Sequence, residues 1–411
     1  MSATCNIRLA TAVILATSVP GARSTGWQTA AVNATRSVDD EKPLAPLMAP
    51  PIEWVTQMTP VYRADANIAR MAYLRMLSSL LTGLSYECDP LAPVNELMRC
   101  IAFLRQGKAW GKQLSPYATS MAGLARMKSL SDQIARVSEM GLKGAYAELG
   151  TWRGGMSIYA TAALQLHGLA DRRVYLCDSF EGLPAPSKNS LRPDEAFYRK
   201  QVYLNVRGPE IVLANFVRYG VPHDQVRAVK GFFVDSMPRF RKDLQANGEV
   251  LAILRLDGDM YDSTIDALYN LYDLVEIGGF IVIDDFGWDR NTSFGARDAV
   301  IDFRALHSIE DADHTMRPTD HAGAWWTKQR EVTLRRDLYL RARDTKADRA
   351  EATRLLRPPN SAFSESQYHD QLRLVWEGRM RATEMRAYNA LSRSPEWDRA
   401  EAGGRGDHHL V

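Results

Sequence analysis

Two segments near the middle of the chain change abruptly from apolar to acidic residues. Residues 251–264 (LAILRLDGDMYDST) and 278–286 (GGFIVIDDF) each contain a short apolar run that ends in aspartates. Short continuous apolar runs of this kind are typical of strands that are buried on both faces of a parallel sheet. We therefore predict two buried strands whose carboxyl ends open into a site lined by acids.

The stretch between these two runs has the pattern of a single helix. Asp262 or Ser263 can cap its start, and the Gly278-Gly279 pair marks its end. Its apolar stripe has helical spacing and consists of Ile265, Leu268, Leu271 and Val275.

A strand-helix-strand unit of this kind has a right-handed crossover and parallel strands. Asp257 and the Asp284-Asp285 pair are therefore expected to emerge at the same edge of the sheet. Three carboxylates at one edge repel one another unless a hard cation lies among them, and Mg²⁺ prefers oxygen ligands. The sequence thus directs the search for function to this edge.

The remaining pattern alternates between strands and helices. Helical spacing of apolar residues occurs at 67–84, 93–105, 121–140, 209–219 and 293–306. Further strands are expected at 144–149, in the run that ends at Asp178, and at 226–233. The helix after the last of these is expected to begin at Asp235 or Ser236, and a closing hairpin of two strands is expected at 314–328. This order predicts an α/β fold with a doubly wound, mostly parallel sheet and an antiparallel last strand.

The two ends of the chain differ in character from its middle. Residues 1–64 are expected to form a disordered tail, because their Ala-, Thr-, Ser- and Pro-rich sequence has no sustained period. A short apolar run after Arg8 has the outline of a secretory signal, but threonines interrupt it, so we expect a cytoplasmic protein. Residues 65–329 are the expected folded domain, and residues 330–411 a charged, arginine-rich helical appendage.

Composition excludes several classes of protein. The chain has 411 residues, 45% hydrophobic and 24% charged, which suffices for one large domain or two ordinary ones. The net charge of +2, from 51 basic and 49 acidic residues, lacks the basic excess typical of nucleic-acid binding. No run approaches the ~20 apolar residues that span a bilayer. The four cysteines have no metal-ligand spacing and are too few to cross-link so long a chain, which favours a reducing compartment.

A glycine-rich turn follows the first expected strand. In GAYAELGTWRGG the strand turns at Gly150 and a helix follows, whose N-terminus favours negative groups of a ligand. Glu148 ends this strand, and Asp178 ends the next one, where an acid can accept hydrogen bonds from ribose hydroxyls. Residues 184–201 are polar and contain several prolines, which predicts a mobile insertion over the site.

Five motifs in this order resemble the macrocin O-methyltransferase family: AELGTWRGG, CDSFEGLP, KGFFVDSMP, LRLDGDMYDST and GGFIVIDDFG. The likeness extends from about residue 67 to residue 328, and YLRMLSSLLTGLSYECDP looks like the family's N-terminal helix. The resemblance implies a class I methyltransferase fold with an N-terminal helical lid. It also implies S-adenosylmethionine as cofactor, a divalent metal, and methyl transfer to sugar hydroxyls of macrolide antibiotics.

The resemblance further implies roles for individual residues. Glu148 and Gly150 would contact the amino-acid part of the cofactor, and Asp178 its ribose. The other implied cofactor contacts are Ser120, Met121, Gly231, Phe232 and Asp235, the last three around the adenine. The implied metal ligands are Asp257, Asp284 and Asp285, and Asp257 is also the implied catalytic proton acceptor. Leu149 and Thr151 depart from the residues that the family usually has in this turn.

The chemistry of these residues agrees with such a reaction. A hydroxyl group is a poor nucleophile at neutral pH, and coordination to Mg²⁺ or another divalent cation lowers its pKa. Asp257 can then accept the proton while the methyl group moves from sulfonium to oxygen. We therefore predict a metal-dependent O-methyltransferase for a small natural product, with a sugar hydroxyl as the expected acceptor. Nucleic-acid and membrane partners are not expected, whereas a homo-oligomer is compatible with this prediction.

Other interpretations of the same residues stay open. Asp257-Gly258-Asp259 also looks like the Asp-x-Asp motif of a nucleotide-sugar glycosyltransferase or the nucleophile motif of a phosphotransferase. A non-catalytic binding protein can also keep the fold. Asp259 and Asp262 are expected to serve the turn and the helix rather than the chemistry. Packing roles are expected for Trp152, Trp325 and Trp326, and surface positions for His314 and His321.

Overall fold

The computed structural model describes residues 66–83, 93, 96, 118–185, 204–287, 295–309, 313–320, 322–344 and 354–356. The tail predicted at 1–64, nearly all of the helix predicted at 93–105 and of the insertion at 184–201, and most of the appendage lie outside the described residues. His321 lies outside them as well.

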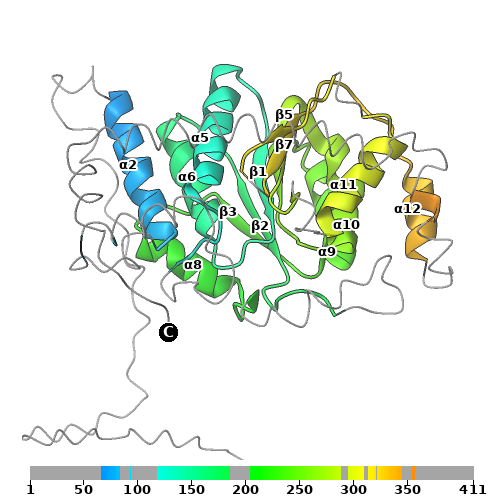
Figure 1. Cartoon of the computed structure of the whole chain (residues 1–411), viewed down its shortest axis with the longest axis horizontal. Helices are drawn as coiled ribbons and strands as arrows, with labels where there is room; N and C mark the ends of the chain where they lie inside the picture. The colour runs from blue at the N-terminus through cyan, green and yellow to red at the C-terminus, as the bar shows by residue number, and fades with distance from the viewer. Residues whose placement is uncertain are drawn as a thin grey trace, which may run out of the picture. The chain divides into compact units, whose positions relative to one another are not determined.

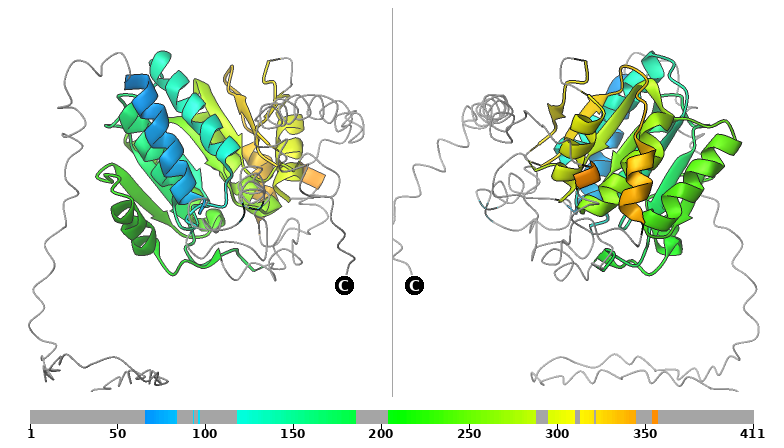
Figure 2. Two further views of the ribbon diagram at one scale, coloured as in Figure 1. Left: turned by 60° about the vertical axis from the view of Figure 1, so that its left-hand side comes forward. Right: turned by 90° about the vertical axis from the view of Figure 1, so that its right-hand side faces the viewer.

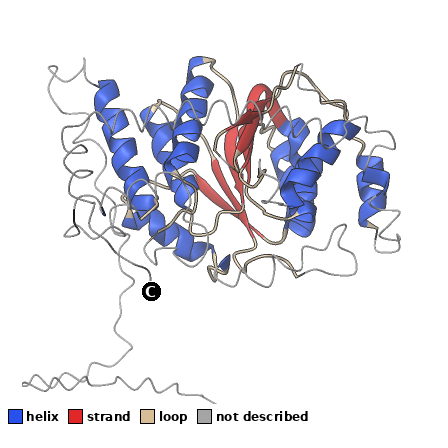
Figure 3. Ribbon diagram, in the orientation of Figure 1, coloured by secondary structure: helices blue, strands red, loops and turns tan. Residues whose placement is uncertain are grey.

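The described strands form one mixed sheet in the order β3-β2-β1-β4-β5-β7-β6 (Figure 3). Their bounds are β1 Ala145–Leu149, β2 Val174–Asp178, β3 Val226–Lys230, β4 Leu251–Leu256, β5 Val275–Ile283, β6 Arg317–Pro318 and β7 Ala324–Thr327. The first five pair in parallel, and β7 pairs antiparallel with both β5 and β6. This confirms the predicted doubly wound, mostly parallel sheet with an antiparallel finish.

Helices cover both faces of the sheet (Figures 1 and 2). One layer contains α2 Ala66–Leu81, α5 Leu124–Glu139, α6 Gly155–Leu166 and α8 Pro209–Arg218, and the other contains α9 Phe233–Ala246, α10 Tyr261–Leu271 and α11 Gly295–Leu306. Every residue of β4 is buried; Ile253 packs into the first layer and Leu254 into the second. The continuous apolar run in β4 follows from this two-sided cover. Among the described helices, none combines the length and apolar character needed to cross a bilayer.

Strand β5 begins earlier than the sequence pattern predicts. Helix α10 ends at Leu271, a short 3₁₀ turn follows, and Val275 is already in the strand rather than in the helix. The pairing of β5 with β4 is irregular between Val275 and Phe280. Gly278 in this stretch has a φ of 90°, and a Cβ on Gly279 would lie 2.8 Å from the carbonyl oxygen of Ala252. The two glycines therefore permit a bulge and a close approach of strands instead of ending a helix.

The junction between β3 and α9 also differs from the prediction. Strand β3 ends at Lys230, and α9 begins at Phe233, two residues before the expected start at Asp235. Gly231, with a φ of 137°, makes the turn between them. The apolar Phe232-Phe233 pair extends the strand pattern in the sequence, but the glycine breaks the extended backbone.

A further helix, α12 (Arg336–Arg343), packs against α10 outside the second helical layer (Figure 1). The Tyr339 ring stacks on Tyr269 with centroids 4.8 Å apart, and its hydroxyl donates to Asp266 at 2.9 Å. Arg343 donates to both oxygens of Asp266 and, at 3.1 Å, to Asp262. These contacts hold α12 against α10, beginning at Asp262 in the first turn of α10.

Candidate active site

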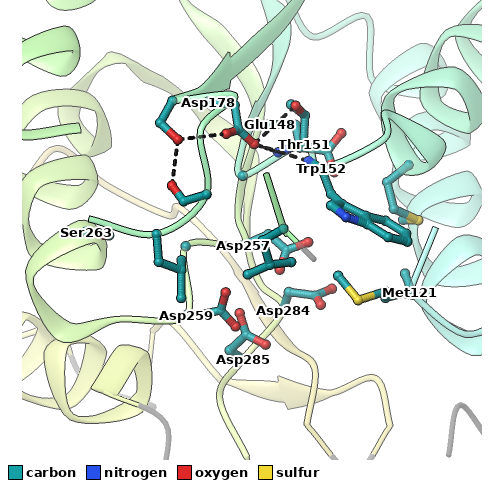
Figure 4. A pocket seen from close by; sticks show the side chains of 18 of the residues that line it. Met121, Glu148, Thr151, Trp152, Asp178, Asp257, Asp259, Ser263, Asp284 and Asp285 are labelled. Carbon is teal, nitrogen blue, oxygen red and sulfur yellow. Dashed lines mark hydrogen bonds between the residues drawn. The ribbon is translucent and has the colours of Figure 1, made fainter. Parts of the chain in front are cut away.

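One cavity opens at the carboxyl ends of β1, β2, β4 and β5, the edge at which the sequence predicts a site. Figure 4 shows Glu148 and Asp178 on one side, Asp284 and Asp285 on the other, and Asp257 between them. The sequence-predicted residues that line this cavity are Ser120, Met121, Glu148, Gly150, Asp178, Phe232, Asp257, Asp284 and Asp285.

Two of the predicted cofactor residues are not brought into this cavity wall. Gly231 forms the turn after β3, and Asp235 is exposed in the first turn of α9. Phe232 and Phe233, which lie between them in the sequence, do line the cavity. The adenine contacts expected of Gly231 and Asp235 stay predictions.

The turn after β1 lies directly against the backbone at the end of β4. The backbone N–H of Asp257 donates to the carbonyl oxygen of Leu149 at 2.7 Å. Gly150 has a φ of 94°, and a Cβ there would lie 1.7 Å from the carbonyl oxygen of Asp257. Only glycine fits this approach, so the glycine-rich turn and the backbone of Asp257 are packed directly against each other.

Asp178 fixes the glycine-rich turn from the neighbouring strand. Its Oδ2 accepts the backbone N–H of Thr151 at 2.7 Å and of Trp152 at 3.1 Å, and its Oδ1 accepts that of Phe180 at 2.7 Å. Burial raises the pKa of Asp178, although these backbone donors oppose the rise. The hydrogen bonds give Asp178 a definite structural role, and its ribose contact stays a prediction.

Glu148 is almost fully buried, with both carboxylate oxygens engaged. Oε1 lies 2.7 Å from a guanidinium nitrogen of Arg255, and Oε2 accepts the hydroxyl of Ser157 from α6. Burial raises the pKa of Glu148 to about 8, although Arg255 and Ser157 lower it. This acid therefore joins the wall of the cavity to a charge network beneath it.

Asp257, Asp284 and Asp285 form a compact group of carboxylates. Each offers one oxygen, and these oxygens all lie within 4.8 Å of one another. Asp285 is 2% exposed, and its Oδ2 has no hydrogen-bond partner. Carboxylate oxygens at this spacing, on residues that include a buried carboxylate with an unpartnered oxygen, suit a small divalent cation with oxygen ligands.

Two buried arginines, Arg126 on α5 and Arg255 on β4, also lie among these carboxylates. Arg255 donates to Asp257 at 2.7 Å and to Asp284, while Arg126 pairs with the other oxygen of Asp284. Arg126 also donates to Asp320 at 2.7 Å, in the turn between β6 and β7. The carboxylates are therefore partly neutralised by the protein itself, a feature that the sequence reasoning missed. Its signal was the arginine within the apolar run LAILRL, since an arginine in a buried strand needs acidic partners.

The acids remain electrostatically crowded despite the two arginines. Burial and the neighbouring Asp284 raise the pKa of Asp257 to about 6, although Arg255 lowers it. Burial and the surrounding aspartates raise the pKa of Asp285 and of Asp259 well above the usual value. The neighbouring carboxylates contribute to each of these raised pKa values, so a bound cation would relieve their mutual repulsion.

The other residues considered in the sequence take varied positions. Asp259, expected to be structural, has a φ of 60° and lines the cavity, whereas Asp262 pairs with Arg343. Trp152 lines the cavity under the side chain of Arg153, 4.4 Å from its ring. Trp326 is fully buried in the core, as predicted for packing. His314 is fully buried rather than on the surface, and its Nε2 accepts the backbone N–H of Gln329.

Comparison with known proteins gives one consistent family. The model of the macrocin-O-methyltransferase family matches residues 92–328. The 8-demethyl-8-(2,3-dimethoxy-alpha-L-rhamnosyl)-tetracenomycin-C 4'-O-methyltransferase of Streptomyces olivaceus is 36% identical over 265 residues, covering 63% of this chain and 93% of the relative. The demethyldecarbamoylnovobiocin O-methyltransferase of Streptomyces niveus is 32% identical over 268 residues, covering 65% and 97%. The solved structure of the O-methyltransferase NovP is similar, with 29% identity and a TM-score of 0.53, and covers 64% of this chain and 100% of that chain.

Proposed function

Because the chain belongs to the macrocin-O-methyltransferase family and is an S-adenosylmethionine-dependent O-methyltransferase of the class I α/β fold, we propose that it methylates a sugar hydroxyl of a natural product. We further propose that Asp257, Asp284 and Asp285 hold Mg²⁺ or another divalent cation. Because the chain belongs to this family, we do not retain the glycosyltransferase, phosphotransferase and binding-protein interpretations of this site.

One observation carries the metal-dependent part of this proposal. The three aspartates lie together in the same cavity as the glycine-rich turn, and Asp285 contributes a buried oxygen without a hydrogen-bond partner. When bound there, a divalent cation would lower the pKa of the acceptor hydroxyl and hold it in place. The sugar as acceptor is supported by the name of the Streptomyces olivaceus relative, which includes a rhamnosyl group.

The protein's own residues account for the remaining steps. The glycine-rich turn, held by Asp178, would contribute to binding the cofactor, which would supply the methyl group. Asp257 has one oxygen held by Arg255 and a side chain that is 28% exposed, so it is fixed in orientation but accessible from the cavity. We propose that it accepts the hydroxyl proton while the S–CH₃ bond breaks and the O–CH₃ bond forms, which leaves S-adenosylhomocysteine and the methyl ether.

The proposed function can be tested by methyl-transfer assays on the full chain. The protein is incubated with S-adenosylmethionine and a panel of natural-product glycosides with their aglycones, and mass spectrometry detects the added methyl group. We expect methylation of glycosides only, loss of turnover in EDTA, and recovery with Mg²⁺. Methylation of aglycones alone would contradict the sugar acceptor, and full activity in EDTA would contradict the metal.

The role of Asp257 has a matched control in the same motif. Asp257→Asn is expected to lower kcat by at least about 10²-fold, within the usual range for loss of a general base, while calorimetry still detects S-adenosylmethionine binding. Asp262→Asn should retain most of the activity, because Asp262 does not line the cavity. Equal losses in both variants would indicate a structural effect on α10 and contradict the assignment of the base.

A further inference from the structure

We propose that Arg255 is a positioning residue that serves as a built-in counter-cation of the acidic cluster. Its guanidinium keeps Asp257 and Asp284 in place before a divalent cation binds, and it limits how tightly the cation is held. This inference rests on the metal site of the proposed function, and it concerns a residue that touches neither cofactor nor acceptor in the proposed reaction.

Strand register explains why Arg255 reaches three acids. Arg255 and Glu148 are directly paired residues of the parallel strands β4 and β1, and Val282 of β5 is the partner on the other side. Side chains alternate between the faces of a strand, so Asp257 projects on the same face as Arg255, and Asp284 on the same face as Val282. The arginine thus lies in the centre of a group of acids that comes from three neighbouring strands.

The guanidinium of Arg255 connects three carboxylates through direct contacts. One terminal nitrogen lies 2.7 Å from Glu148 and 2.7 Å from Asp257, and the other donates to Asp284. The Arg255 side chain is only 1% exposed, so water cannot replace these bonds. A planar guanidinium fixes the relative positions of its acceptors in a way that a lysine ammonium cannot.

The three proposed metal ligands differ in how they are held. Asp284 is paired through both oxygens, to Arg255 and Arg126, and Asp257 is paired through one. Asp285 has a buried oxygen without a partner. Two ligands are therefore oriented by guanidinium groups, while the third is left for the cation, and the fixed positive charges oppose part of the cation's attraction.

A merely structural role for Arg255 predicts a different response to metal. If the arginine only supported the fold, its loss would loosen the cluster and weaken cation binding. If it is a counter-cation, its loss leaves Glu148, Asp257 and Asp284 with less positive charge, so the cation binds more tightly and takes over the stabilising role. The sign of the change in Mg²⁺ affinity separates the two explanations.

The test compares full-length wild type with Arg255→Met, which keeps an unbranched side chain that can fill part of the buried space but removes the guanidinium and its charge. Calorimetry measures Mg²⁺ binding, and thermal unfolding is followed with increasing Mg²⁺ at constant ionic strength. For Arg255→Met we expect a lower unfolding midpoint without Mg²⁺, a larger rise with Mg²⁺, on the order of tenfold tighter binding, and a reduced kcat. Arg241→Met is the control, because Arg241 forms its ion pair with Asp273 away from the cavity; its response to Mg²⁺ should equal that of wild type.

The outcomes separate this inference from the proposed function. Weaker or unchanged Mg²⁺ binding in Arg255→Met, with clear binding by wild type, would overturn the role of Arg255 and leave the metal site standing. No Mg²⁺ response in wild type, with full turnover in EDTA, would overturn the metal site and the inference together. Should Arg255→Met not accumulate as folded protein, Arg255→Lys provides the test. This variant should bind Mg²⁺ as wild type does, because the positive charge remains. Its kcat should be lower, because an ammonium group cannot hold several carboxylates in fixed positions as the planar guanidinium does.

Discussion

Removal of Arg343 should destabilise the protein by an amount that depends strongly on pH. In Arg343→Ala, Asp266 keeps its buried position on α10, with 2% exposure, but loses the guanidinium that contacts both of its oxygens. Loss of one partner of a buried ion pair costs about 3–5 kcal/mol. Tyr339 still donates to Asp266, so we expect the lower end, about 3 kcal/mol at pH 8, or a Tm roughly 6–12 °C lower for a domain of this size.

The pH dependence follows from the pKa of Asp266. Burial raises this pKa from 3.8 to about 6 even with Arg343 and Tyr339 nearby. A pKa raised by folding contributes stability that is present below the unfolded value and is lost as pH rises through the folded value. Without Arg343 the folded pKa rises further. At pH 5 the carboxyl is mostly protonated in both proteins and the deficit is small, whereas at pH 8 wild type is ionised and paired, and the deficit is full.

Urea unfolding at pH 5 and pH 8, followed by circular dichroism, measures this difference. Arg341→Ala is the control, because Arg341 is exposed on the same helix, where a charged group contributes little to stability. A deficit of equal size at both pH values, or one under about 1 kcal/mol at pH 8, would refute the assignment of Asp266 as a buried, arginine-dependent acid.

Three further predictions concern the site. Gly150→Ala should lower both Tm and methyl transfer because its Cβ would overlap the carbonyl oxygen of Asp257; Gly168→Ala, also at positive φ but with open space around it, should have a much smaller effect on Tm and none on turnover. Burial alone would raise the pKa of Asp320, but Arg126 lowers it to about 2, so Asp320→Asn should cost about 2 kcal/mol at pH 7, and the difference from wild type in urea unfolding should shrink as pH falls from about 4 towards 2. Turnover should rise with pH through an apparent pKa at or below about 6, because only ionised Asp257 can accept the proton and a bound cation lowers its pKa; a kcat that is constant from pH 4 to pH 8 would contradict this role.

Sequence patterns were sufficient for the order of strands and helices and for the carboxyl-edge location of the acids. They failed where the decisive contact is distant in the sequence. The Gly278-Gly279 pair has the pattern of a helix end, but glycine is required at position 279 because its backbone lies close to Ala252 of the neighbouring strand. No local pattern reports such an approach.

The charge balance of the site was incompletely predicted for the same reason. Arg255 precedes Asp257 by two residues, yet its other partners are 107 and 29 residues away, and Arg126 reaches Asp284 across 158 residues. The aspartates could be assigned to one edge because parallel strands end together. Arg126 joins Arg255 among these carboxylates only because α5 packs on this face of the sheet, and the local sequence pattern does not specify that packing.

The two outer strands of the sheet restrict how two copies of this enzyme can associate. β3 has exposed charged residues at Arg227 and Lys230, and β6 is only two residues long and ends in Pro318, which has no N–H to donate. Short, charged and proline-containing outer strands are poor templates for strand addition from another chain. Among the described strands, neither edge therefore favours a continuous intermolecular sheet. We expect any dimer of this protein to use helical surfaces, so that assembly leaves the strand register beneath the site unchanged.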